Sequence, residues 1–141
     1  MARCGPMTIE FFMPMVPPTM THQAKQLAVT KAGRPVMFDS AELRAVRVKL
    51  RGHLGPHVGG LRLNGALRLM SKWCWPCEGT GHTNGEYITG KPDTDNLAKT
   101  LKDAMEDVGA FAVGDQQVAS EITEKFWADV PGIYVRLEEL T

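Results

Sequence analysis

The 141-residue sequence lacks the features that mark several large classes of protein. Its three cysteines are too few, and an odd number, for a disulfide framework, which suits a reducing compartment. No apolar run approaches the roughly 18 residues that a membrane-crossing helix needs. The first residues, MARCGP, show no charged segment followed by an apolar one, so no secretory signal is expected. We therefore expect a cytoplasmic protein with no membrane association.

Neither sign of charge dominates, because 16 basic side chains balance 16 acidic ones. This balance argues against a strong general attraction to phosphate. The charges are nevertheless unevenly spread: residues 42–72 hold seven basic side chains and one acidic, whereas residues 73–141 hold five basic and thirteen acidic. The first of these segments is suited to contact phosphate, and the second is suited to form a cluster of carboxylates. The solvated face of a helix explains the basic cluster equally well.

Length and composition fit one domain over residues 1–141, with a loop or hairpin insertion at about residues 73–92. The first helix is expected to begin at a capping box of Asp39 and Glu42 and to end at Gly55-Pro56. The second is expected to run from about Asn96 to Gly109. Strands are predicted at residues 7–13, 27–30, 35–38, 61–73, 118–127 and 132–140, with a short returning strand at 87–89.

The order of these elements is strand, hairpin, helix, strand, helix, strand, strand. It predicts an α/β or α+β fold in which two main helices cover a mixed β-sheet. Gly65, inside the predicted strand 61–73, is interpreted as a β-bulge.

Residues 91–99, KPDTDNLAK, place two carboxylates two positions apart where an extended segment meets a helix. Extended backbone points Asp93 and Asp95 to the same side, and Mg²⁺ binds one or two carboxylates together with water and substrate phosphate. Lys99 follows Asp95 by four residues and shares its helix face. Asp115, at a turn after a glycine, supplies a third acid. Three acids and a lysine fit metal-assisted phosphodiester hydrolysis. The same spacing is also explained if Asp95 is only a helix cap, Asp93 a turn residue and Lys99 a partner in a surface ion pair.

A longer pattern carries a family resemblance. KPDTDNLAKTLKDAM at residues 91–105, followed by GDQQV at residues 114–118, resembles the signature of the RusA family of Holliday-junction resolvases and its phage-encoded relatives. The resemblance implies four catalytic residues: Asp93, Asp95, Lys99 and Asp115. The three aspartates among them are implied to bind the metal. Lys99 is implied to stabilise charge on the phosphate, since a role as general base would require a strongly lowered pKa.

The resemblance also implies an activity and an assembly. We expect an α/β homodimer that acts as a Mg²⁺-dependent endodeoxyribonuclease, with Mn²⁺ as a substitute. Its substrate would be branched DNA, cut by paired nicks at four-way junctions during recombination and repair in a bacterial or phage-infected cell. A two-fold dimer presents two identical sites to such a junction. Whether each site holds one metal ion or two stays open.

The segment before the signature, WCWPCEGTGH at residues 73–82, departs from the basic character that the family often has there. Cys74, Cys77 and His82 form a candidate zinc site. Its fourth ligand would come from Glu78, His53 or His57. Two ordinary thiols in a hairpin tip are the alternative interpretation. A small zinc-knuckle interaction protein is therefore one rival function.

DNA contact is the other question that the composition raises. Basic side chains suit phosphate, and tryptophans either stack on exposed bases or pack at the base of a loop. The candidate DNA-binding residues are Arg44, Arg47, Arg51, Lys72, Trp73, Trp75 and Lys91. A branched-DNA-binding module without catalysis is thus the second rival function.

Overall fold

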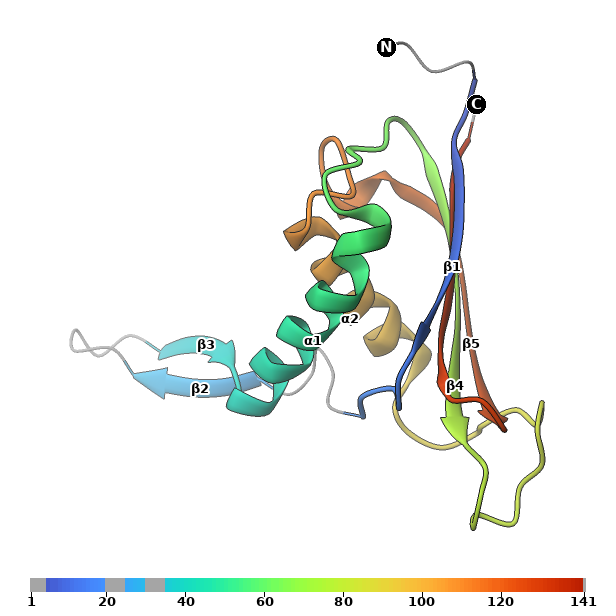
Figure 1. The fold of residues 1–141 in the computed structure, drawn as a ribbon. Helices are drawn as coiled ribbons and strands as arrows, with labels where there is room; N and C mark the ends of the chain where they lie inside the picture. Colours follow the sequence, from blue (N-terminus) through green and yellow to red (C-terminus); the bar gives the residue numbers. More distant parts are fainter. Residues whose placement is uncertain (1–4, 20–24, 30–34, 141) are drawn as a thin grey trace.

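The computed structural model describes residues 5–19, 25–29 and 35–140. Its elements are β1 (Thr8–Pro14), β2 (Lys25–Val29), β3 (Pro35–Asp39), α1 (Ala41–Val58), β4 (Leu67–Pro76), α2 (Thr94–Asp107), the short 3-10 helix η1 (Asp115–Gln117), β5 (Val118–Ala128) and β6 (Gly132–Glu139). Four strands form one sheet in the order β1-β6-β4-β5, and the two helices lie against one of its faces (Figure 1). This single α+β domain confirms the predicted fold class.

The sheet is mixed. β6 pairs antiparallel with β1 and with β4, whereas β4 and β5 are parallel. The parallel pair requires a crossover connection, and the chain between β4 and β5 includes α2. Alternate residues of β4 are buried toward the helices, from Leu67 through Trp73 to Trp75. The core therefore lies between the helices and one sheet face, and α2 is held over that face with its polar side outward.

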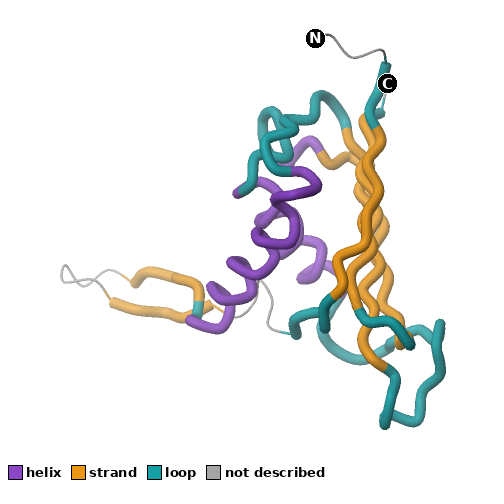
Figure 2. The backbone as a smooth tube through the Cα atoms, in the orientation of Figure 1, coloured by secondary structure: helices purple, strands orange, loops and turns teal. Residues whose placement is uncertain are grey.

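The hairpin predicted for residues 27–38 is confirmed as the antiparallel pair β2–β3. It extends away from the helices and the main sheet (Figure 2). Its predicted connection at residues 31–34 lies outside the described residues.

Both predicted boundaries of α1 were wrong. Its N-cap is Ser40, whose Oγ accepts a hydrogen bond from the Leu43 N–H at 3.1 Å, because Asp39 is still paired with β2. The helix also continues through Gly55-Pro56 to Val58. Leu54 and Val58 are both fully buried, so packing of the last turn outweighs the hydrogen bond that proline cannot make.

The strand predicted at residues 61–73 begins later, at Leu67, and continues to Pro76. Residues 60–63 pair instead with the segment that follows α2, as in the Leu63 N–H to Ala110 oxygen bond of 2.8 Å. Gly65 is a turn residue with φ of +68°, not a bulge. Trp73 and Trp75 belong to β4, so the long connection begins at Cys77.

The short strand predicted at residues 87–89 is a single antiparallel bridge between Tyr87 and Phe126. Backbone hydrogen bonds nevertheless hold residues 85–88 along the edge of β5. In the described ranges, neither α1 nor α2 combines the length and apolar character needed to cross a bilayer.

Candidate active site

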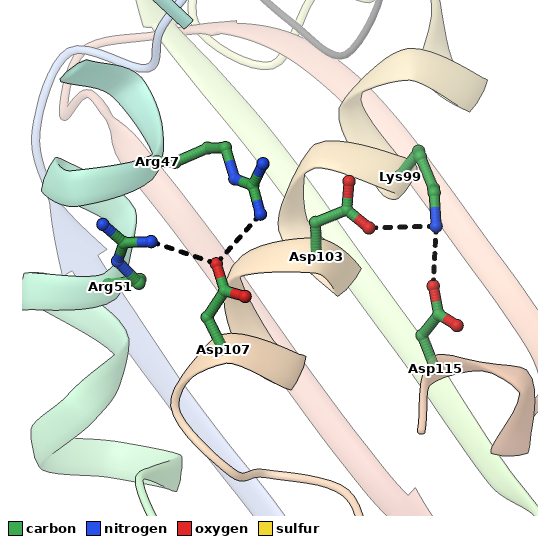
Figure 3. A network of polar contacts seen from close by, with 6 residues as sticks. All are labelled: Arg47, Arg51, Lys99, Asp103, Asp107 and Asp115. Atoms are coloured by element: carbon green, nitrogen blue, oxygen red, sulfur yellow. Dashed lines mark hydrogen bonds and ion pairs between the residues drawn. The ribbon is translucent and has the colours of Figure 1, made fainter. Parts of the chain in front are cut away.

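The polar face of α2 carries a lysine held between two carboxylates (Figure 3). Lys99 Nζ lies 2.8 Å from Asp115 at the start of η1 and 2.9 Å from Asp103, one helical turn along α2. The hydrogen bond to Asp115, followed by that to Asp103, raises the pKa of Lys99. The side chain is thus an ammonium ion at neutral pH. This charge state suits stabilisation of an anion and is the opposite of what a general base requires.

Carboxylates gather around the same point. Asp103, Glu106 and Asp115 each offer an oxygen, and these oxygens lie within 4.8 Å of one another. Oxygen donors are the ligands that hard cations such as Mg²⁺ prefer, so the donor chemistry fits such an ion. Three carboxylates against one ammonium also leave the cluster negative, and a phosphate group would be repelled unless a cation joined it.

The other two predicted aspartates lie at the beginning of α2. Asp93 is the N-cap residue in extended conformation, and its carboxylate lies 2.9 Å from Lys91 Nζ. Asp95 stands in the first turn, and its Oδ1 accepts a hydrogen bond from the Asn96 N–H at 3.0 Å. Along the helix, Asp95, Lys99 and Asp103 follow one another at intervals of four residues, and so share one side. Asp115 contacts Lys99 directly. The carboxylates of Asp93 and Asp95 instead bond to Lys91 and Asn96, their near neighbours in the sequence.

Gln117 positions Asp115, a role that the sequence did not reveal. Its Oε1 accepts hydrogen bonds from the N–H groups of Val113 and Gly114 at 2.7 and 3.1 Å. Its Nε2 donates to the carbonyl oxygens of Leu63 and Gly65 at 2.9 and 3.0 Å. One side-chain amide therefore ties the Asp115 turn to the loop after α1. Gln116 and Gln117 are adjacent in the signature GDQQV, and nothing in the string says which of them faces inward.

Lys125 acts similarly on the segment before Asp93. From β5 its Nζ donates to the carbonyl oxygens of Gly90 and Pro92 at 2.5 and 2.9 Å. Both carbonyls lie within three residues of Asp93, so Lys125 fixes the backbone that leads into α2. The sequence held no signal for this role, because it depends on the register of β5 against a loop 35 residues away.

The predicted DNA-contact residues fall into different environments. Arg47 and Arg51 both bind Asp107 Oδ2, at 3.1 and 3.2 Å, so part of the positive charge on α1 is neutralised (Figure 3). These three residues and Arg44 line a cavity of about 300 Å³. Lys91 is 81% exposed.

The remaining three DNA-contact candidates belong to β4. Lys72 lies over the ring of Tyr134, 5.6 Å from its centroid, on the sheet face away from the helices. Trp73 is completely buried and bonds Ser71 Oγ, and Trp75 is 8% exposed and donates to the Pro17 oxygen. Trp73 is therefore a core residue without access to DNA.

The candidate zinc residues are not brought together. In the described part of the chain, Cys74, Cys77 and His82 do not form a group with all ligand atoms within 4.8 Å. Cys77 Sγ donates to Asp129 at 3.3 Å, and the His82 ring stacks on Trp127. Burial raises the pKa of Cys74, and partial desolvation followed by the bond to Asp129 raises that of Cys77. Both side chains are thus neutral thiols at pH 7. Of the suggested fourth ligands, His57 stacks on Phe11.

Comparison with known proteins gives one family. The family model described as endodeoxyribonuclease RusA matches residues 13–138, which include both the α2 cluster and the segment that leads into it. No curated protein matches the chain.

Proposed function

Because the chain belongs to the RusA family of endodeoxyribonucleases, we propose that it is a Mg²⁺-dependent enzyme that resolves four-way DNA junctions by paired nicks. The observation that carries the proposal is the Lys99 ammonium held beside carboxylates on the exposed side of α2. An ammonium ion and oxygen ligands for a hard cation are the groups that phosphodiester hydrolysis needs.

In this proposal Asp93, Asp95 and Asp115 hold the metal. All three offer hard oxygen donors, and Asp115 already lies in a carboxylate cluster that is suited to a cation. Bound Mg²⁺ would neutralise charge on the phosphate and activate a water molecule as the nucleophile. Mn²⁺ has the same preference for oxygen ligands and is proposed as a substitute.

Lys99 would stabilise the negative charge that develops on the phosphate. Its ammonium is kept protonated by two carboxylates and lies at the surface, with 40% of the side chain exposed. Asp103 stays one turn away and holds the lysine in place when a substrate arrives. Asp103 is in this view a positioning residue for Lys99.

Paired nicks need two sites in one assembly. A two-fold homodimer presents two copies of the α2 cluster to the two symmetry-related strands of a four-way junction. We therefore propose that the active form is a homodimer and that branched DNA is its partner.

The test compares four carboxylate variants with a control. Asp93→Asn, Asp95→Asn and Asp115→Asn are expected to lose cleavage of a labelled four-way junction in Mg²⁺ while still binding it. Glu106→Gln, in the same cluster, is expected to retain most cleavage because Glu106 is not among the proposed ligands. Asp129→Asn, at an exposed turn, is the control for the chemical change. Cleavage by Asp93→Asn at the parental rate would contradict the assignment, and complete loss in Glu106→Gln would move the metal site to Asp103, Glu106 and Asp115.

A further inference from the structure

A cavity of about 470 Å³ lies where the 77–92 connection folds against the ends of β4 and β5. Its lining includes Trp75, His82, Glu86, Ile88, Lys91 and Trp127. The volume falls within the roughly 300–1,000 Å³ typical of small-molecule sites. Nothing in the proposed hydrolysis uses this cavity.

The aromatic side of the cavity is held rigidly. Trp75 and Trp127 are register partners on the parallel strands β4 and β5. The ring of His82 stacks on Trp127, with 4.7 Å between centroids and 6° between planes. Backbone hydrogen bonds from Gly85 to Trp127 and from Trp127 to Glu86, both 2.8 Å, fasten the connection to β5. The π-faces are therefore ordered before any ligand arrives.

The polar side of the cavity carries hydrogen-bonding groups suited to a base edge. Glu86 accepts hydrogen bonds from the Thr83 N–H at 3.0 Å and lies 3.1 Å from His82 Nδ1. The bond from Thr83, followed by that from His82, lowers the pKa of Glu86, so it is a carboxylate at neutral pH. A carboxylate accepts hydrogen bonds from the amino groups of bases. Lys91 adds a positive charge.

The cavity adjoins the proposed cleavage site through residues 91 and 92. Lys91 and Pro92 line it and directly precede Asp93, and the Lys91 ammonium bonds the Asp93 carboxylate at 2.9 Å. A nucleotide whose phosphate lay near Asp93 would have its base within reach of this lining.

We propose that this cavity binds one unstacked base of the branched DNA, next to the phosphodiester that is cut. The proposal rests on the proposed function and specifies how its substrate is held. Stacking on aromatic side chains tolerates any base, because every base has a π-face. Bases at the centre of a branch are the ones that can leave the helical stack at low cost, since a base without a full complement of neighbours loses less on extrusion.

The first test is photochemical crosslinking to the parental protein. A four-way junction carries a single 5-iodouracil, either beside the crossover or in the middle of one arm, and EDTA prevents cleavage during irradiation. We expect a crosslink from the crossover position that maps to the peptide containing His82 or Trp127, and none at these residues from the arm position. Crosslinks that map only to other parts of the chain, or no crosslink from the crossover position, would overturn the proposal.

The second test uses a matched pair of variants. Trp127→Leu removes a lining ring, whereas Phe12→Leu removes a 39% exposed ring on β1, at the opposite edge of the sheet and outside the cavity lining. In EDTA, Trp127→Leu is expected to bind the junction about tenfold more weakly, the scale of one lost base-stacking contact, while Phe12→Leu binds normally. Trp127→Phe should retain most of the affinity. Binding by a folded Trp127→Leu variant within twofold of the parent would overturn the proposal.

These outcomes separate the two proposals. Absence of cleavage by the parental protein in Mg²⁺ would contradict the nuclease function, and it would leave the crosslinking result to decide the base site. Cleavage of junctions without a crosslink at the cavity would refute the base site alone.

Discussion

The turn that carries Asp115 should depend on the side-chain amide of Gln117. Its two donated hydrogen bonds, to Leu63 and Gly65, and its two accepted ones, from Val113 and Gly114, all have lengths between 2.7 and 3.1 Å. Gln117→Glu keeps the size and the acceptors of the side chain but removes both donors. The new carboxylate would then face two carbonyl oxygens.

The expected loss of stability in Gln117→Glu follows from these hydrogen bonds. Each lost hydrogen bond is worth about 1 kcal/mol, and an acceptor left facing acceptors adds a similar penalty, so we expect a loss of about 2–4 kcal/mol in unfolding free energy. For a chain of this size, about 3 °C of melting temperature accompanies each kcal/mol, which gives a fall of about 6–12 °C. Junction cleavage should fall as well, because Asp115 and Lys99 lose their fixed spacing.

The pH dependence of the stability of Gln117→Glu distinguishes the loss of these hydrogen bonds from a general loss of packing. The carbonyl oxygens would raise the folded-state pKa of the introduced Glu above its unfolded value. The penalty is therefore full at neutral pH and is relieved as the pH falls through that raised pKa. Thermal unfolding at pH 7 and pH 5 measures this penalty, with Ala119→Glu, which introduces the same carboxylate at an exposed position of β5, as the control. Equal melting temperatures for the two variants at pH 7 would refute the role of Gln117.

Three further experiments test the roles of Lys125, Gly132 and Asp129. Lys125→Met removes both bonds to the Gly90 and Pro92 carbonyls and should lower the rate of junction cleavage about tenfold; an unaltered rate would show that Asp93 needs no such support. Gly132→Ala places a Cβ 2.7 Å from the Met13 carbonyl oxygen and 2.1 Å from the Phe12 ring, and urea unfolding should show a loss of about 1–3 kcal/mol. Cys77 has a raised pKa, through partial desolvation and then the bond to Asp129, so its alkylation by iodoacetamide should be slower at pH 7 than that of a free cysteine, and Asp129→Asn should accelerate it. Equal alkylation rates with and without Asp129 would contradict that cause.

Much of the fold was accessible from sequence because its elements are strongly patterned. The apolar stripe of α2 at Leu97, Leu101 and Met105 and the alternation of β6 at Ile133, Val135 and Leu137 predicted both elements nearly to their ends. Errors arose where tertiary packing overrides local signals. Pro56 did not end α1, because Leu54 and Val58 on either side of it are buried and hold the last turn of the helix against the core.

The candidate site was predictable only in part for a similar reason. Asp93, Asp95 and Lys99 stand out because they lie close together along the chain, and Asp115 stands out in the segment GDQQV; the structure brings Lys99 and Asp115 into contact. Gln117 and Lys125 were missed because they act through backbone carbonyls of distant loops, and such bonds leave no pattern in a sequence. The cluster of Asp103 and Glu106 with Asp115 was likewise hidden, since it requires knowing how the turn at Asp115 lies against α2.

A cleavage assay on the parental protein is the most direct test of the proposed nuclease function. A labelled four-way junction and a linear duplex of the same sequence are incubated with the protein in Mg²⁺ or in EDTA. The proposed function predicts symmetric paired nicks in the junction in Mg²⁺, little cleavage of the duplex, and none of either DNA in EDTA. Junction binding without nicks at any Mg²⁺ concentration, or equal cutting of junction and duplex, would contradict it.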